Sequence, residues 1–133
     1  MLKRYICLVS TLLSVVALAQ VGTLDVTFGG SGIVNTSIWL TDDIGWSMAT
    51  QSDGKIVIAG TTSSTFKSYF IIARFDTNGM LDKTLASRGI VTVGFGNGND
   101  VGRALAIQPD GRIVVAGSAL GGSWYDFAVA RLN

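Results

Sequence analysis

The chain has 133 residues, with 10 Lys and Arg against nine acidic residues and a formal net charge of +1. A charge so close to zero argues against a nucleic-acid-binding protein, which needs a basic surface. The sequence has no His and no Glu, so all nine acids are Asp. These absences exclude Ser-His-Asp and Cys-His catalysis and His-ligated zinc. They also remove the commonest acid–base group of glycosidases.

Residues 1–19 have the features of a cleavable export signal. Lys3 and Arg4 precede an apolar run that closes with Ala17-Leu18-Ala19. A basic start, an apolar stretch and a small-x-small end are typical of a signal peptide. The run is shorter than the roughly 20 residues of a membrane-spanning helix. We therefore predict cleavage after Ala19 and a secreted or cell-envelope location. The only cysteine, Cys7, would leave with the signal.

The rest of the chain is one unit written twice, with a constant offset of 57 residues. The motif DGKIVIAG at 53–60 recurs as DGRIVVAG at 110–117. Aligning 22–76 with 79–133 gives 55 pairs, of which 20 are identical, far more than chance would give. Self-similarity at a fixed period indicates a repeat architecture. We therefore divide residues 20–133 into repeat 1 (22–78) and a truncated repeat 2 (79–133).

Each copy predicts four short strands. Asp53-Gly54 and Asp110-Gly111 lie between apolar runs, which is a strong hairpin signal. Gly60 and Gly117 are expected to end the second strand of each copy at a sharp turn. The predicted strands, in equivalent pairs, are 33–36 and 90–93, 45–51 and 102–108, 55–59 and 112–116, and 69–75 and 126–132.

These strands carry apolar side chains on both faces, so their sheets must be covered on both sides. Four antiparallel strands per repeat, packed against like neighbours, describe a β-propeller blade. We predict an all-β fold of tandem four-stranded antiparallel blades, about two in number, forming an incomplete propeller. A two-sheet sandwich is the alternative. Because closed propellers have about 4–8 blades, we expect a truncated chain that has additional blades in the intact protein, or a homo-oligomer.

The linked motifs resemble the delta-60 repeat family of bacterial secreted β-propeller proteins. The DG[KR]IV[IV]AG motif is followed by FxxAR at 70–74 and 127–131, and then by NGxLD at 78–82. The resemblance covers nearly all of 22–133 and departs from the pattern at Leu85-Ala86, where the first copy has Phe28-Gly29. It implies export and a propeller fold, and it supplies no catalytic residues.

Two arginines and two aspartates recur at equivalent places. Arg74 and Arg131 end the third strands, whereas Asp25 and Asp82 lie in the linkers. A half-buried Arg normally requires a carboxylate partner, so we predict Arg–Asp pairs that fix each linker onto a blade. A ligand-binding Arg is the alternative. The residues expected to carry the structural motif are Asp25, Asp53, Gly54, Gly60, Arg74, Asp82, Asp110, Gly111, Gly117 and Arg131.

Other polar and aromatic side chains are further candidate sites. Asp53 and Asp110 are expected to accept backbone N–H groups within their hairpins. The oxygen-rich loops 41–43 and 97–100 could hold Ca²⁺ but lack the EF-hand spacing, so we predict no metal and no cofactor. Exposed aromatic side chains could stack on sugars or pack between blades; these are Trp39, Trp46, Trp124 and Tyr125.

The sequence predicts an exported, non-enzymatic repeat module with no catalytic residues. Its role would be binding or adhesion, or a structural part of a larger secreted or envelope protein. The sequence does not identify the partner, for which a glycan and an envelope protein are the candidates. A fragment of a propeller-type hydrolase or lyase is the alternative, and a purely structural spacer is a third possibility.

Overall fold

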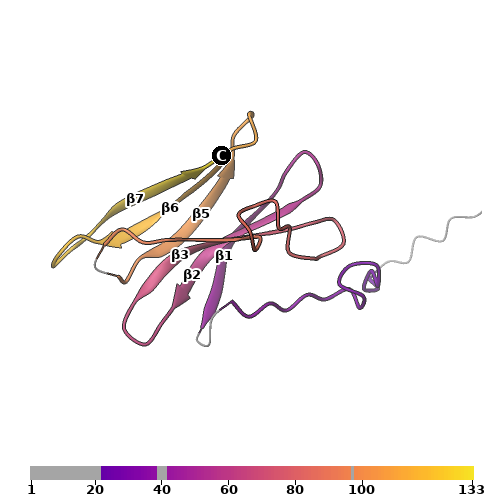
Figure 1. Cartoon of the computed structure of the whole chain (residues 1–133), viewed down its shortest axis with the longest axis horizontal. Helices are drawn as coiled ribbons and strands as arrows, with labels where there is room; N and C mark the ends of the chain where they lie inside the picture. The colour runs from indigo at the N-terminus through magenta and orange to yellow at the C-terminus, as the bar shows by residue number, and fades with distance from the viewer. Residues whose placement is uncertain (1–21, 39–41, 97) are drawn as a thin grey trace, which may run out of the picture.

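The structure is a computed structural model that describes residues 22–38, 42–96 and 98–133, so the predicted signal segment lies outside the described residues. The described residues form two antiparallel sheets, named sheet A and sheet B here (Figure 1). Sheet A has the order β1-β2-β3-β4, and sheet B has the order β5-β6-β7. The strands are β1 (Asp43–Thr50), β2 (Ile56–Ser63), β3 (Ser68–Phe75), β4 (Ile90–Val93), β5 (Val101–Ile107), β6 (Ile113–Leu120) and β7 (Tyr125–Leu132).

In both sheets the spatial order of the strands follows their order in the chain. A β-propeller blade has this meander order, whereas an immunoglobulin-like sandwich has Greek-key crossovers. The predicted all-β fold of about two blades in an incomplete propeller is therefore confirmed, with four strands in the first blade and three in the second. Within the described residues, no helix is long and apolar enough to cross a membrane.

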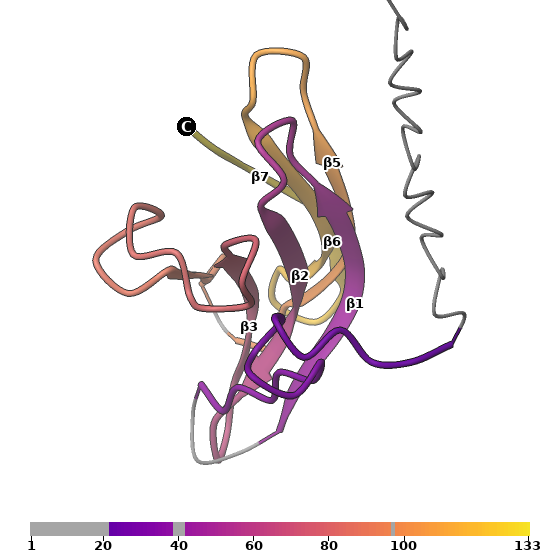
Figure 2. The ribbon, with the colours of Figure 1, turned by 90° about the vertical axis from the view of Figure 1, so that its right-hand side faces the viewer.

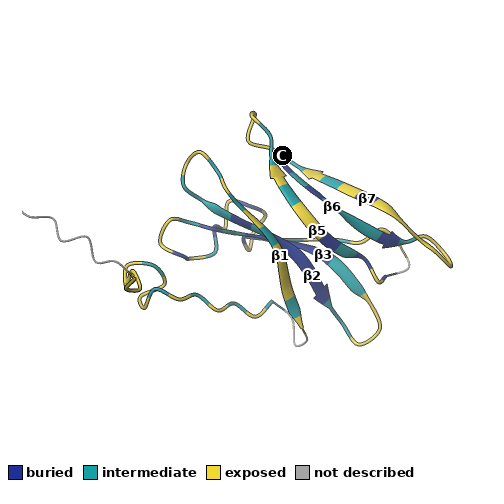
Figure 3. Ribbon diagram, turned by 180° about the vertical axis from the view of Figure 1, so that it is seen from behind, coloured by how far each residue is buried: buried dark blue, intermediate teal, exposed yellow. Residues whose placement is uncertain are grey.

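The core lies where the two sheets meet (Figure 3). Sheet A contributes an inner face on which Val57, Ala59, Phe70 and Ile72 are fully buried. The Phe70 ring lies so close to sheet B that a Cβ added to Gly117 would come within 3.0 Å of its Cζ. Apolar burial of this kind stabilises the pair of sheets by about 25 cal/mol per Å². The remaining core side chains are Leu85, Ile113, Val115, Ala119 and Ala128.

Gly60 and Gly117 do not end their strands, so that prediction is wrong. Each lies within its strand, which continues to Ser63 in β2 and to Leu120 in β6. Both stand beside a bulge in the neighbouring strand, where the backbones approach closely. A Cβ at either position would lie 1.9 Å from a carbonyl oxygen of that neighbouring strand. These glycines therefore serve close backbone approach rather than a turn.

The predicted strand at 33–36 is also wrong, since these residues form no strand. Its equivalent, β4, pairs with β3 of the preceding repeat, and no repeat precedes 33–36 in the part of the chain that the structure describes. Its side chains nevertheless alternate in burial as those of a strand do, with Val34 and Thr36 half-buried and Ile33 and Asn35 exposed. Figure 2 shows 22–38 and the linker 76–89 lying outside the two sheets.

Gly60→Ala should lower the free energy of unfolding by about 2–3 kcal/mol, because its Cβ meets the rigid carbonyl of Ile44. Urea denaturation of the variant measures the change. The matched control is Gly121→Ala, whose Cβ would approach most closely the flexible carboxylate of Asp126. This change should cost less than about 1 kcal/mol. Equal losses in the two variants would contradict this role for Gly60.

Candidate functional site

A charge cluster fixes the linker after β3 to sheet A. Nε of Arg74 lies 2.9 Å from Oδ2 of Asp82. A second guanidinium nitrogen of Arg74, Nη2, donates to the Thr84 hydroxyl at 2.8 Å, and Asp82 N donates to the Arg74 carbonyl at 2.8 Å. The side chains of Arg74 and Asp82 are only 13% and 8% exposed. The structure thus brings together Arg74 and Asp82 as a largely buried pair that holds the linker on the blade.

Lys55 connects this pair to the hairpin between β1 and β2. Its Nζ lies 2.9 Å from Oδ2 of Asp53 and 3.4 Å from Oδ2 of Asp82. Asp53 Oδ1 also accepts the backbone N–H of Lys55 at 3.2 Å. The hydrogen bond from the Lys55 side chain is the main reason that the pKa of Asp53 lies below its ordinary value, and it raises the pKa of Lys55. Four charged groups therefore tie hairpin, strand and linker together.

Asp82 is held in its charged form. The hydroxyl of Thr84 donates to Asp82 Oδ1 at 2.7 Å and the Thr84 backbone N–H donates to the same atom at 3.0 Å. These two hydrogen bonds are the main causes that lower the pKa of Asp82 to about 2, with help from the charges of Arg74 and Lys55 and against the effect of burial. The carboxylate acts as an anionic brace, not as a proton donor.

The linker before β1 contains the same turn without the cations. Thr27 donates to Asp25 Oδ1 through its backbone N–H at 2.9 Å and through its hydroxyl at 2.6 Å. These hydrogen bonds lower the pKa of Asp25. Of the predicted Arg–Asp pairs, Arg74–Asp82 forms, whereas neither Arg131 nor Asp25 is in any ion pair of the described residues. In the formed pair the Asp follows its Arg by eight residues in the next linker, whereas Asp25 precedes Arg131.

The second hairpin repeats the first in part. Asp110 Oδ1 accepts the backbone N–H of Arg112 at 3.1 Å, and this bond is the main cause that lowers the pKa of Asp110. The Arg112 guanidinium pairs with Asp110 and also donates to Asn133 Oδ1 at 3.1 Å. Gly54 and Gly111 take φ values of +83° and +85°, the left-handed conformation that the hairpins require.

Sequence reasoning missed the role of Asp43 and Asp100, which it placed in candidate calcium loops. Asp43 Oδ2 accepts the Ile38 backbone N–H, and Asp100 Oδ2 accepts that of Phe95, both at 2.8 Å. The identity of these two aspartates at the 57-residue offset was the available signal. Residues 41 and 97 of those loops lie outside the described residues, among which no group of three or more acidic side chains could hold a metal ion.

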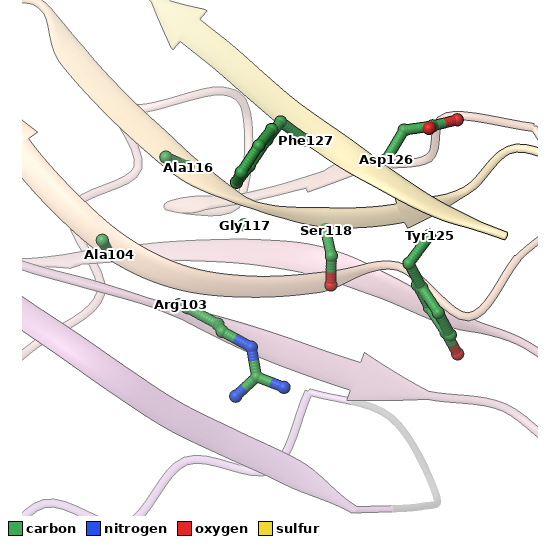
Figure 4. A pocket seen from close by; sticks show the side chains of 8 residues that line it. All are labelled: Arg103, Ala104, Ala116, Gly117, Ser118, Tyr125, Asp126 and Phe127. Carbon is green, nitrogen blue, oxygen red and sulfur yellow. The ribbon is translucent and has the colours of Figure 1, made fainter.

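Figure 4 shows an open pocket of about 590 Å³ on sheet B. Phe127 is fully exposed there, and Tyr125 is 59% exposed. The two charged side chains of the lining, Arg103 and Asp126, point away from each other, so the pocket presents no acid–base pair. The Arg103 guanidinium instead lies 5.7 Å from the centre of the Trp46 ring, a cation–π distance. The remaining lining residues are Ala104, Ala116, Gly117 and Ser118.

Of the other candidate aromatic side chains, Trp124 is 79% exposed. Trp39 lies outside the described residues. Trp46 contacts Arg103 between the sheets, and Tyr125 lines the pocket of sheet B. The candidate aromatics are therefore divided between the inter-sheet contact and the open face of sheet B, and no single sugar-stacking platform joins them within the described chain.

Asp82→Asn should lower the melting temperature most at neutral pH. The pKa of Asp82 falls from an ordinary 3.8 to about 2 in the fold, so its contribution is complete above the unfolded value and is lost as pH falls toward 2. The difference between wild type and variant should therefore shrink on acidification. Thermal melts across this pH range measure it. Asp42→Asn, which removes an exposed carboxylate, is the control and should show little difference; a pH-independent gap for Asp82→Asn would contradict the assignment.

Comparison with known proteins matches the repeated part of the chain to a β-propeller family. A family model described as a domain of unknown function (DUF5122) beta-propeller matches residues 51–85 and 108–133. The two matched stretches begin at equivalent positions, Gln51 and Gln108. No curated protein and no solved structure matches the chain. Parts of both repeats are thus similar to a β-propeller family, and the described residues form one four-stranded and one three-stranded blade-like sheet.

Proposed function

We propose that the chain is an exported, non-enzymatic β-propeller module of the delta-60 type that works by binding through its exposed surfaces. The observation that carries the proposal is the use of its carboxylates. Seven of the nine aspartates accept a backbone N–H group in a turn or linker. They are Asp25, Asp43, Asp53, Asp76, Asp82, Asp100 and Asp110.

A carboxylate that is committed to a backbone turn is a poor general acid or base, because moving a proton on or off it would break the turn. The open pocket on sheet B supports the same conclusion, since it is mainly apolar and its two charges diverge (Figure 4). Both features favour binding over the alternative of a propeller-type hydrolase or lyase. A glycan and an envelope protein are the candidate partners in this proposal.

Export follows from the signal-like residues 1–19. Produced in a bacterial host, the chain should appear outside the cytoplasm, and its mass should be that of residues 20–133. Ala19→Arg should abolish processing because signal peptidase requires a small residue at that place, whereas Ala19→Ser should be processed normally. Intact mass spectrometry of the purified chains reads out both results. A wild-type chain with the mass of the uncleaved sequence would contradict export with signal cleavage.

The absence of catalysis is tested directly. The purified chain should give saturable binding on a glycan array or to an envelope extract, with no turnover of glycoside or ester substrates. Turnover that is lost in Asp53→Asn or Asp110→Asn while the melting temperature is retained would favour the hydrolase alternative. Asp42→Asn is the control, since its carboxylate is exposed and lies outside both hairpins.

A further inference from the structure

Equivalent faces of the two sheets are buried very unequally (Figure 3). Phe70 on the inner face of sheet A is 0% exposed, whereas its equivalent Phe127 on sheet B is 102% exposed. Ile72 is likewise 0% exposed, and its equivalent Val129 is 61% exposed. The first face is covered by sheet B. The second face, the outer face of sheet B, has the same kind of side chains and no sheet over it among the described residues.

The surface that receives Phe70 is also present in two copies. Phe70 lies against Gly102 and Gly117 of sheet B. Their equivalents, Gly45 and Gly60, line a groove of about 200 Å³ on the outer face of sheet A. The groove is otherwise mainly apolar, lined by Val34, Asn35, Thr36, Ile38, Asp43, Ile44, Ile58, Ile71, Ala73 and Phe75. The chain therefore repeats both surfaces of its inter-sheet contact. The outer face of sheet B carries the equivalent of the Phe70 side, the outer face of sheet A carries the equivalent of the glycine side, and the two do not meet within one copy.

The strand edges show the same relation. β3 pairs with β4, with Phe70 opposite Val93 and Ile72 opposite Val91. No strand pairs with the outer edge of β7 within the described chain. The segment equivalent to β4 is 33–36, which already alternates between half-buried and exposed residues like a strand. The 57-residue offset places Thr36 opposite Phe127 and Val34 opposite Val129.

The charges complete the match. Arg131 has the strand position of Arg74 but is exposed, and it takes part in none of the ion pairs of the described residues. Asp25 has the turn of Asp82, with the same two hydrogen bonds from a threonine, but no cation beside it there. Residue 112, the equivalent of Lys55, is again a cation, Arg112. Arg112 already pairs with Asp110. Asp25 without a cation and Arg131 without a carboxylate thus lie on the two unjoined surfaces.

We propose that the outer face and edge of sheet B bind residues 22–36 and the outer face of sheet A of a second copy of this chain. The inference rests on the proposed function, because it names the partner of a binding module. Residues 33–36 of one copy become the fourth strand of sheet B in the next copy, Phe127 enters the groove at Gly45 and Gly60, and Arg131 pairs with Asp25.

The two surfaces of one copy cannot meet each other, because the inner faces already pack together and hold the outer faces apart. The contact is therefore head-to-tail and repeats from copy to copy, which closes a ring when the rotation allows it. Since closed propellers have about 4–8 blades and each copy supplies two sheets, a closed ring would contain about two to four copies.

Charge exchange tests the pairing through mass in solution. Arg131→Asp and Asp25→Arg should each weaken self-association of the full chain at least about tenfold, because each leaves like charges facing each other. The double variant restores opposite charges at every contact and should recover the wild-type mass in sedimentation velocity. Lys67→Asp, at an exposed position between β2 and β3, is the charge-matched control. A monomeric wild type, or a double variant no better than the single variants, would overturn the proposal.

A disulfide test fixes the register. Two chains are mixed, both carrying Cys7→Ser, one with Val129→Cys and the other with Val34→Cys. Directly opposite residues have Cβ atoms about 4.5–5.5 Å apart, so mild oxidation should give a covalent heterodimer. The control uses Ile33→Cys in place of Val34→Cys. Neighbouring side chains of a strand point to opposite faces of the sheet, so Cys at position 33 would face away from Cys at position 129. Equal yields from both mixtures, or none, would overturn the register. Because neither test uses a ligand or a substrate, each can fail while the proposed non-enzymatic function stands, and the reverse also holds.

Discussion

The need to cover both faces of every sheet governs this molecule. The central strands carry apolar side chains on both sides, so a sheet with only one neighbour leaves half of its apolar surface in water. Sheet A meets sheet B on its inner face, and there Val57 and Phe70 are fully buried. On its outer face sheet A has a groove bordered by residues 34–38, in which Ile71, Ala73 and Phe75 are buried. Sheet B has a covered inner face and a bare outer one, where Phe127 and Val129 are exposed.

Aspartate provides most of the local restraint. With a single proline in the chain, and its single cysteine in the signal-like segment, the loops need another means of holding their shape. Asp53 and Asp110 close the hairpins, Asp82 holds the linker, and Asp43 and Asp100 hold the approach to the first strand of each sheet. Short Asp side chains suit this task, because they reach backbone N–H groups about two residues away at little entropic cost.

The repeat made most of the fold predictable, since a constant offset turns every local signal into two independent ones. The hairpins at Asp53-Gly54 and Asp110-Gly111 and the bounds of β4 agree with the sequence-based expectation. The errors share one cause, which is that pairing is a property of neighbours. Glycine predicts a strand end at Gly60 because it favours turns, but the role of Gly60 depends on a bulge in the neighbouring β1. Similarity to β4 predicts a strand at 33–36, but these residues have no β3 equivalent to pair with among the described residues.

The candidate site was predictable to the same extent. An eight-residue spacing across the repeat boundary brings Arg74 to Asp82. Arg131 and Asp25 belong to opposite ends of the described chain, where sequence similarity alone does not say which neighbour each one meets. The roles of Asp43 and Asp100 were hidden for a different reason. An Asp that braces a loop and an Asp that binds a cation have the same local sequence, and only the direction of the carboxylate distinguishes them.

The repeat also bears on how the pocket of sheet B should be interpreted. A small-molecule site normally combines apolar walls with a few polar groups that converge on the ligand, whereas Arg103 and Asp126 diverge (Figure 4). The equivalent surface of sheet A, around Ala59 and Phe70, is filled by sheet B and fully buried. The pocket on sheet B is therefore equivalent to a surface that a neighbouring sheet covers in sheet A, and it is apolar like that surface. Its occupant is therefore expected to be another sheet rather than a small ligand.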